Sequence, residues 1–131
     1  MNLPVKDLDT TKAFFGKLGF SFNPQFSDDK TACLVISDTI FAMLLTEPRF
    51  KEFTKKEIAD TSRTTEVLLA LSAESREKVD EMADTALASG GSPANEPQDH
   101  GFMYGRSFQD PDGHTWEVIW MDPSAVEGQQ G

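Results

Sequence analysis

The stretch FMYGRSFQDPDGHTWEVIWM, residues 102–121, decides how the C-terminal half of this chain folds. Apolar and polar residues alternate on both sides of the tetrapeptide DPDG, residues 110–113, and such alternation is typical of β-strands with one buried face. Pro followed closely by Gly suits a tight turn. The stretch therefore predicts a hairpin made of strands 102–109 and 114–121.

The alternation within this hairpin also assigns side chains to faces, because successive residues of a strand point to opposite sides. Trp116 and Trp120 share one face, which we expect to pack beneath a helix. Glu117 lies on the opposite face and should point into an open groove. His114 lies three residues before Glu117 and should therefore face away from it.

The elements that precede the hairpin complete a strand-helix-three-strand order. We expect a strand at 65–71, a helix at 75–88 that Ser75 caps, and a weak strand at 92–95. The same order occurs in the N-terminal half, where the pattern predicts a strand at 3–5, a helix at 9–18 and strands at 20–26, 30–36 and 39–45. The chain is therefore predicted to be an α+β protein with two βαβββ modules.

The module boundaries follow from a polar stretch in the middle of the chain. We expect one domain over residues 1–131, because a chain of this length typically forms one domain. Its parts are module 1 at 1–46, a link at 47–63 with a short helix near 50–58, module 2 at 64–122, and a polar tail at 123–131 that should fray. The modules can be laid on each other with Phe41 on Trp116, or with Val5 on Leu71.

The composition excludes several classes of partner. The formal net charge is −10, from 22 acidic and 12 basic residues, so nucleic acid and anionic membrane surfaces are not expected partners. No apolar run approaches the roughly 18–20 residues of a membrane span, and the start does not resemble a signal peptide. The single cysteine, Cys33, lies in an apolar run and should be buried, and a chain without an internal disulfide fits the cytoplasm.

Two motifs carry a resemblance to a known family. The segments LPVKDL (3–8), FF (14–15) and LGF (18–20) are similar to the opening of glyoxalase-like proteins, and YGRSFQDPDGHTWE (104–117) resembles their closing hairpin. The chain thus resembles the glyoxalase / bleomycin-resistance / extradiol-dioxygenase (vicinal oxygen chelate) superfamily. The resemblance implies two βαβββ modules forming an open curled sheet, and a homodimer.

The resemblance also implies a metal site and its ligands. Family enzymes hold a divalent metal such as Zn, Ni, Mn or Fe, which acts as a Lewis acid on chelating substrate oxygens. Glu117 matches the carboxylate ligand of the second module. Glu66, five residues before Leu71, matches the first-strand ligand and could also act as a base. The alternatives are a groove carboxylate at Glu117 paired with Arg106, and a solvent-facing Glu66.

The first module departs from the family pattern. Ala42 stands at the position laid on Glu117, and the position that matches Glu66 falls before Met1. Two carboxylates make a weak site for metals that prefer about six ligands. We therefore expect weak metal binding or none, with Arg106 as the candidate partner of an unmetallated carboxylate.

Three further residues are candidates for contact with a ligand. His100 lies in a loop that could reach the groove mouth, where a group that titrates near neutrality could shuttle protons. Tyr104 and Arg106 share a strand face with Phe108. Arg106 could clamp a carboxylate or phosphate, or it could bond Asp110 or a main-chain carbonyl.

Three functions remain open from the sequence. The favoured one is a groove that binds or sequesters a small molecule, with an incomplete metal site. The alternative is a metal-dependent glyoxalase-like lyase or dioxygenase acting on a small oxygenated substrate. A dimeric scaffold without a small ligand is the third.

Overall fold

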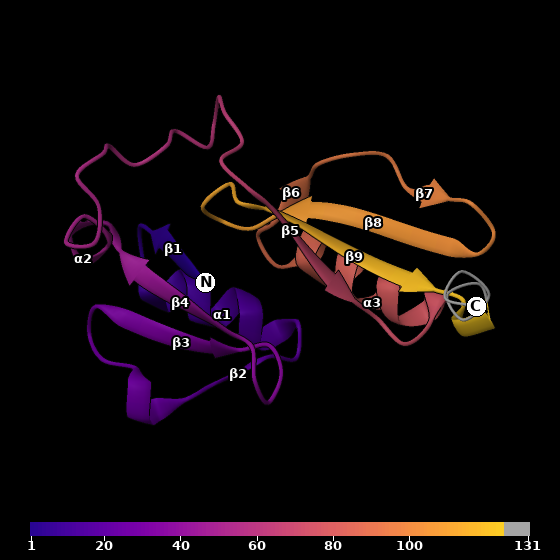
Figure 1. Ribbon diagram of the computed structural model, residues 1–131, viewed down its shortest axis with the longest axis horizontal. Coiled ribbons are helices and arrows are strands. Elements are labelled where there is room, and N and C mark those ends of the chain that lie inside the picture. The colour runs from indigo at the N-terminus through magenta and orange to yellow at the C-terminus, as the bar shows by residue number, and fades with distance from the viewer. Residues whose placement is uncertain (125–131) are drawn as a thin grey trace. The chain divides into compact units, whose positions relative to one another are not determined.

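Two similar runs of secondary structure make up residues 1–124, the part of the chain that the computed structural model describes (Figure 1). They belong to two compact units, an N-terminal unit of residues 1–64 and a C-terminal unit from Thr65 onward. The polar link predicted between the modules thus groups with the first unit. Each run follows the predicted order, so the α+β fold with two βαβββ modules is confirmed.

The N-terminal unit holds a four-stranded sheet in the order β1-β4-β3-β2. Its elements are β1 (Asn2–Val5), α1 (Leu8–Lys17), β2 (Ser21–Phe22), a 3₁₀ helix η1 (Pro24–Phe26), β3 (Thr31–Val35), β4 (Phe41–Thr46) and α2 (Glu47–Phe50). β1 runs parallel to β4, whereas the other neighbours are antiparallel. A crossover helix is what a parallel pair needs, and α1 provides it.

Helix α1 begins and ends one residue before the predicted bounds, 9–18. The Asp7 carboxylate accepts hydrogen bonds from the backbone N–H groups of Asp9 and Thr10, which an N-cap residue does. Gly19, at a φ of 98°, ends the helix in a conformation that costs other residues more. Phe14 and Phe15 are buried in the core of the unit.

Two predictions in this unit are wrong in extent. The strand predicted at 20–26 stops at Phe22, because the Asn23 side chain caps the 3₁₀ helix that Pro24 starts. The short helix predicted near 50–58 instead occupies Glu47–Phe50, with Pro48 in its first turn. Cys33 is buried and its thiol is free, as predicted.

The C-terminal unit holds a five-stranded sheet in the order β5-β9-β8-β6, with β7 also paired to β8. Its elements are β5 (Leu68–Ser72), α3 (Arg76–Ala88), β6 (Ser92–Pro93), β7 (Gln98–Asp99), β8 (Met103–Gln109) and β9 (Thr115–Met121). The antiparallel β8-β9 hairpin is the one that the opening stretch predicts. β5 starts three residues later than expected, and β7 lies in a segment predicted as a loop.

Helix α3 packs across β8 and β9 and covers one face of this sheet (Figure 1). Ser75 caps it by accepting a hydrogen bond from the Lys78 backbone N–H. Val79 and Ala83 of the helix are fully buried, as are Trp116 and Val118 of β9. The predicted packing of Trp116 beneath a helix is therefore confirmed. The opposite side of the sheet, called the open face below, carries Glu117.

Within residues 1–124, no helix is both long and apolar enough to cross a bilayer. The tail predicted to fray lies, from residue 125 onward, outside the described residues.

Candidate functional site

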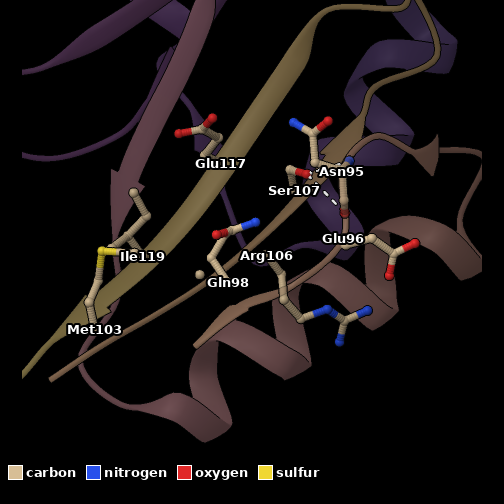
Figure 2. Close-up of a pocket in the computed structure, with 9 residues that line it drawn as sticks. Asn95, Glu96, Gln98, Met103, Arg106, Ser107, Glu117 and Ile119 are labelled. Atoms are coloured by element: carbon tan, nitrogen blue, oxygen red, sulfur yellow. Dashed lines mark hydrogen bonds between the residues drawn. The ribbon is translucent and has the colours of Figure 1, made fainter. Parts of the chain in front are cut away.

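The open face of the C-terminal sheet forms the floor of a cavity of about 450 Å³ (Figure 2). Strand register explains its lining, since Glu117 stands opposite Ser107 of β8 and Ala70 of β5, while Ile119 stands opposite Gly105. Gly105 has no side chain, so it leaves room above the sheet. The lining residues are Asn95, Glu96, Gln98, Met103, Gly105, Arg106, Ser107, Glu117 and Ile119.

Glu117 is half-buried in this lining, on the face that the alternation predicts. Among residues 1–124, its carboxylate has no hydrogen-bond or ion-pair partner. The neighbouring Ser107 hydroxyl, in contrast, accepts a hydrogen bond of 2.8 Å from the Asn95 backbone N–H. That bond ties the segment before β7 to β8, and both Asn95 and Ser107 border the cavity.

Arg106 does not pair with Glu117, and that prediction is wrong. Its guanidinium donates hydrogen bonds to Asp80 at 3.1 Å and Asp84 at 2.7 Å, both on α3. The reason is register, because Arg106 stands opposite Val118 and so shares the helix-covered face. Figure 2 shows the guanidinium directed away from Glu117. Nor, among the described residues, does it bond Asp110 or a main-chain carbonyl, the other contacts that the sequence left open.

Tyr104 lies on the same helix-covered face and is part of the same network. Its hydroxyl donates a hydrogen bond of 2.6 Å to the Asp80 carboxylate. That bond, together with the one from Arg106, lowers the pKa of Asp80 below its ordinary value. Tyr104 and Arg106 therefore fasten α3 to β8, and neither polar group is directed at Glu117.

Residues 98–101, called the rim below because Gln98 borders the cavity, are fastened by a second network at the start of α3. Arg76 donates two hydrogen bonds of 2.9 Å to the Asp99 carboxylate and one of 3.0 Å to the Gly101 carbonyl. The guanidinium beside it lowers the pKa of Asp99 to about 2. Gln98, the neighbour of Asp99, borders the cavity. His100, in the same segment, is exposed and is not among the residues that line the cavity. Its ring stacks on that of Phe102, with 6.4 Å between the ring centroids.

Glu66 lies apart from the cavity lining. Its carboxylate approaches Nδ1 of His114 at 2.6 Å, and the His114 side chain is only 2 % exposed. Strand alternation assigns His114 to the face opposite Glu117. The structure thus brings Glu66 to a buried histidine and does not place it beside Glu117.

The DPDG turn is held by a buried carboxylate. Asp110 is 4 % exposed and accepts hydrogen bonds from the backbone N–H groups of Asp112 and His114 and from the Trp116 indole. Burial raises the pKa of the Asp110 carboxyl, although these donors and His114 favour its charged form. Asp110 thereby fixes where β9 starts, and with it the position of Glu117.

The structure corrects how the two modules are laid on each other. Asp7 and Ser75 correspond, because each is the N-cap of its module's long helix. The residue five positions before Asp7 is Asn2, which pairs with Met43. The residue five positions before Ser75 is Ala70, which pairs with Glu117. Met43 therefore matches Glu117, and the match with Ala42 is wrong by one residue.

Burial agrees with that shift of register. Ala42 is 0 % exposed, on the face that packs against α1, whereas Met43 lines a separate cavity of about 360 Å³ in the N-terminal unit. A slip of one residue changes the face, because the side-chain period is two.

The same superposition moves the first-strand position. With Val5 matched to Ala73, the residue five positions earlier in the second module is Leu68 and not Glu66. Leu68 is 57 % exposed and stands opposite Thr115, on the open face. An aliphatic side chain thus occupies the place where the resemblance implies a ligand.

The donor groups present do not fit a divalent metal of the family type. Leu68 and Met43 supply no oxygen or nitrogen ligand, and Glu66 is occupied by His114. In the described part of the chain, no three His, Cys, Asp or Glu side chains lie close enough to share an ion. A divalent cation of this kind takes about six oxygen or nitrogen ligands, and the Glu117 carboxylate alone supplies too few of them.

Several site residues carry no sequence signal of their own. Asn95 and Gln98 line the cavity because the segment between β6 and β8 folds over the sheet, whereas Ser107 lines it from β8. None of these residue types marks a site by itself. Asp80 and Asp84, which hold Arg106, are recognisable in the sequence only as polar positions of the helix. Their four-residue spacing puts them on one helix face, which is the available clue.

The comparisons with known proteins agree with this fold. A family model described as the Glyoxalase/Bleomycin resistance protein/Dioxygenase superfamily matches residues 1–118. No protein of curated function is detectably similar in sequence.

Among solved structures, a hypothetical protein, SA1046 from S. aureus, shares 25 % identity at a TM-score of 0.78, covering 91 % of this chain and 89 % of that one. A glyoxalase/bleomycin resistance protein/dioxygenase family enzyme from Burkholderia phytofirmans PsJN has 16 % identity and a TM-score of 0.75, covering 92 % and 95 %.

A third similar structure is the fosfomycin resistance protein FosX from Listeria monocytogenes. A mutant of it complexed with Mn(II) and 1S,2S-dihydroxypropylphosphonic acid has 21 % identity and a TM-score of 0.63, covering 89 % of this chain and 83 % of that chain. At this identity the likeness shows the fold alone. Because the family model spans nearly the whole chain, from β1 to the middle of β9, this protein belongs to the glyoxalase/bleomycin resistance/dioxygenase superfamily.

Proposed function

We propose that this protein binds a small molecule in the cavity of its C-terminal unit, with Glu117 as the central polar contact and without a tightly held metal. The observation that carries the proposal is the unpartnered, half-buried Glu117 carboxylate in a cavity of about 450 Å³. Cavities of that size suit small ligands. A partly buried charge without a partner is costly, so a ligand that completes it gains affinity.

The cavity supplies both kinds of contact that a small-molecule site needs. Met103 and Ile119 provide apolar surface, while the Asn95 and Gln98 amides and the Ser107 hydroxyl can donate and accept hydrogen bonds. Gln98 and the exposed His100 lie on the rim that Arg76 fastens, so His100 remains a candidate contact at the mouth.

A fragment screen by NMR tests this function on the full chain. A library of mixed charge is added to ¹⁵N-labelled protein, and the expected hits shift the backbone amides of residues 105, 107, 117 and 119. Gly105→Val, which fills the floor of the cavity, should abolish those shifts. Hits that persist in Gly105→Val, or a screen without hits at these amides, would refute binding at this site.

The alternative is a metal-dependent lyase or dioxygenase of the glyoxalase type. It is supported by the position of Glu117 on the closing hairpin and by the likeness to a FosX that holds Mn(II). In that case Glu117 would be one ligand, and Glu66, His100 or a residue of a second copy would have to complete the site. Calorimetry with zinc, nickel and manganese decides, because micromolar binding that disappears in Glu117→Gln would establish the alternative.

We further propose a homodimer in the cytoplasm. Both sheets end in an edge strand, β1 or β5, and pairing with a second copy is a common way to cover exposed sheet. The free, buried Cys33 thiol suits a reducing compartment. Light scattering at micromolar concentration should give twice the 14.5 kDa chain mass, and a monomer mass would refute the dimer.

A further inference from the structure

The charge of the cavity narrows the class of ligand that it can take. Glu117 and Glu96 contribute two carboxylates to the lining, and the amides of Asn95 and Gln98 are neutral. Among residues 1–124, Arg106 is the one basic residue that lines the cavity. Whether the cavity accepts an anion or a cation therefore depends on where that guanidinium points.

The Arg106 guanidinium is held on the other face of the sheet, by helix α3. Its side chain is 18 % exposed and is held by both Asp80 and Asp84. Asp80 is fixed in turn by the Tyr104 hydroxyl. Turning Arg106 toward Glu117 would break two charge-assisted bonds, which are among the stronger hydrogen bonds in proteins. Asp84 would lose its partner, and Asp80 would keep only the bond from the Tyr104 hydroxyl.

An anionic ligand would consequently meet an uncompensated Glu117 carboxylate. Like charges at contact distance repel, and solvent screens this repulsion less at the half-buried Glu117 than in bulk water. A protonated amine or amidine would instead pair with Glu117 and could donate its remaining N–H groups to the side-chain carbonyls of Asn95 or Gln98.

We propose that the cavity selects a small organic cation, an amine or amidine whose apolar body lies against Met103 and Ile119. This inference rests on the proposed small-molecule function and deepens it. An organic cation needs only one carboxylate and a few acceptors, which this lining has. A divalent metal needs a ligand set that the side chains of residues 1–124 do not supply. The net charge of −10 favours the approach of cations further.

A matched series of three planar probes tests the charge preference directly. Benzamidine, benzamide and benzoate have similar shapes and differ in charge, and each is titrated into the ¹⁵N-labelled full chain at low ionic strength. We expect benzamidine to shift the amides of residues 105, 107, 117 and 119 with a Kd at least about tenfold lower than that of the other two probes.

Two variants locate the preference. Glu117→Gln, which is nearly isosteric, should remove the advantage of benzamidine. Glu77→Gln removes one negative charge from the exposed side of α3 and should leave that advantage intact. An advantage that falls equally in both variants would mean that net charge alone produces it, which overturns the inference.

The remaining outcomes separate this inference from the proposed function. Benzoate binding as tightly as benzamidine at the same amides would refute cation selection while supporting a small-molecule cavity. No shift at these amides with any of the three probes would also refute cation selection, and the mixed-charge screen then decides the function independently. Manganese that broadens the same amides at micromolar concentration would identify a metal site in place of an organic-cation site.

Discussion

The buried Asp110 carboxylate should be the polar group on which the folded C-terminal unit depends most. Its oxygens accept hydrogen bonds of 3.0 Å from the His114 backbone N–H and 2.9 Å from the Trp116 indole, both of them buried, and a third of 2.9 Å from the part-buried Asp112 N–H. Asp110→Ala leaves the two buried donors without an acceptor. We therefore expect this substitution to destabilise the unit strongly.

The expected loss follows from the number of stranded donors. Each unsatisfied buried donor costs roughly 1–3 kcal/mol, so two donors cost roughly 2–6 kcal/mol. Burying the Asp110 carboxylate itself costs free energy, so removing it offsets part of that loss. The net decrease in the free energy of unfolding is then about 3 kcal/mol, out of a typical stability of about 5–15 kcal/mol. Asp110→Asn keeps one carbonyl oxygen as an acceptor and should lose about half as much.

Urea unfolding followed by tryptophan fluorescence measures this loss selectively, because both tryptophans, Trp116 and Trp120, belong to the C-terminal unit. With an m-value of about 1.5 kcal/mol/M, Asp110→Ala should lower the midpoint by about 2 M. Asp38→Ala, in the corresponding exposed turn of the N-terminal unit, is the control and should barely move it. Equal midpoints for the two variants would refute the structural role of Asp110.

The raised pKa of Asp110 adds a pH dependence with a defined sign. A carboxyl whose folded pKa lies above the unfolded value of 3.8 binds more protons when folded than when unfolded between those two values. Stability from this group therefore falls as pH rises from about 3.8 through the folded pKa. Asp110→Asn should lack that decrease, and an unchanged pH profile in the variant would contradict it.

The remaining predictions concern the cavity and its rim. Gly105→Ala should fold and retain ligand binding, because the added Cβ would lie 3.4 Å from Ile119 Cγ1, which is an ordinary contact. Gly105→Val should abolish the NMR shifts caused by fragment hits without unfolding the chain. Arg76→Gln removes the hydrogen bonds from the guanidinium to the Asp99 carboxylate and the Gly101 carbonyl. It should therefore speed hydrogen exchange of the backbone amides of Asp99 and Gly101 by at least about tenfold. Lys78→Gln, on the same helix, is the control. The Asp99 carboxyl should titrate at about 2 by NMR, and its contribution to stability, present above about 3.8, should be lost as pH falls toward 2.

Local sequence chemistry determined much of this protein in advance. The alternation around the DPDG turn specifies the hairpin, the burial of Trp116 and the opposite placement of Glu117, because these depend only on strand period and turn chemistry. The two long helices, α1 and α3, lie within a residue of their predicted starts and ends, since Asp7, Ser75 and Gly19 act on the backbone next to them. The repeated order of elements then predicts the family fold.

Only the tertiary structure decided which residues meet across elements. A match of Ala42 with Glu117 is one residue away from the observed match with Met43, and that step changes the sheet face. Arg106 and Glu117 are close in sequence across the turn, yet register places Arg106 beside Asp80 and Asp84 of α3. Strand period assigns each side chain to a face, whereas strand register and helix rotation follow from packing over the whole unit, and they select each side chain's partner.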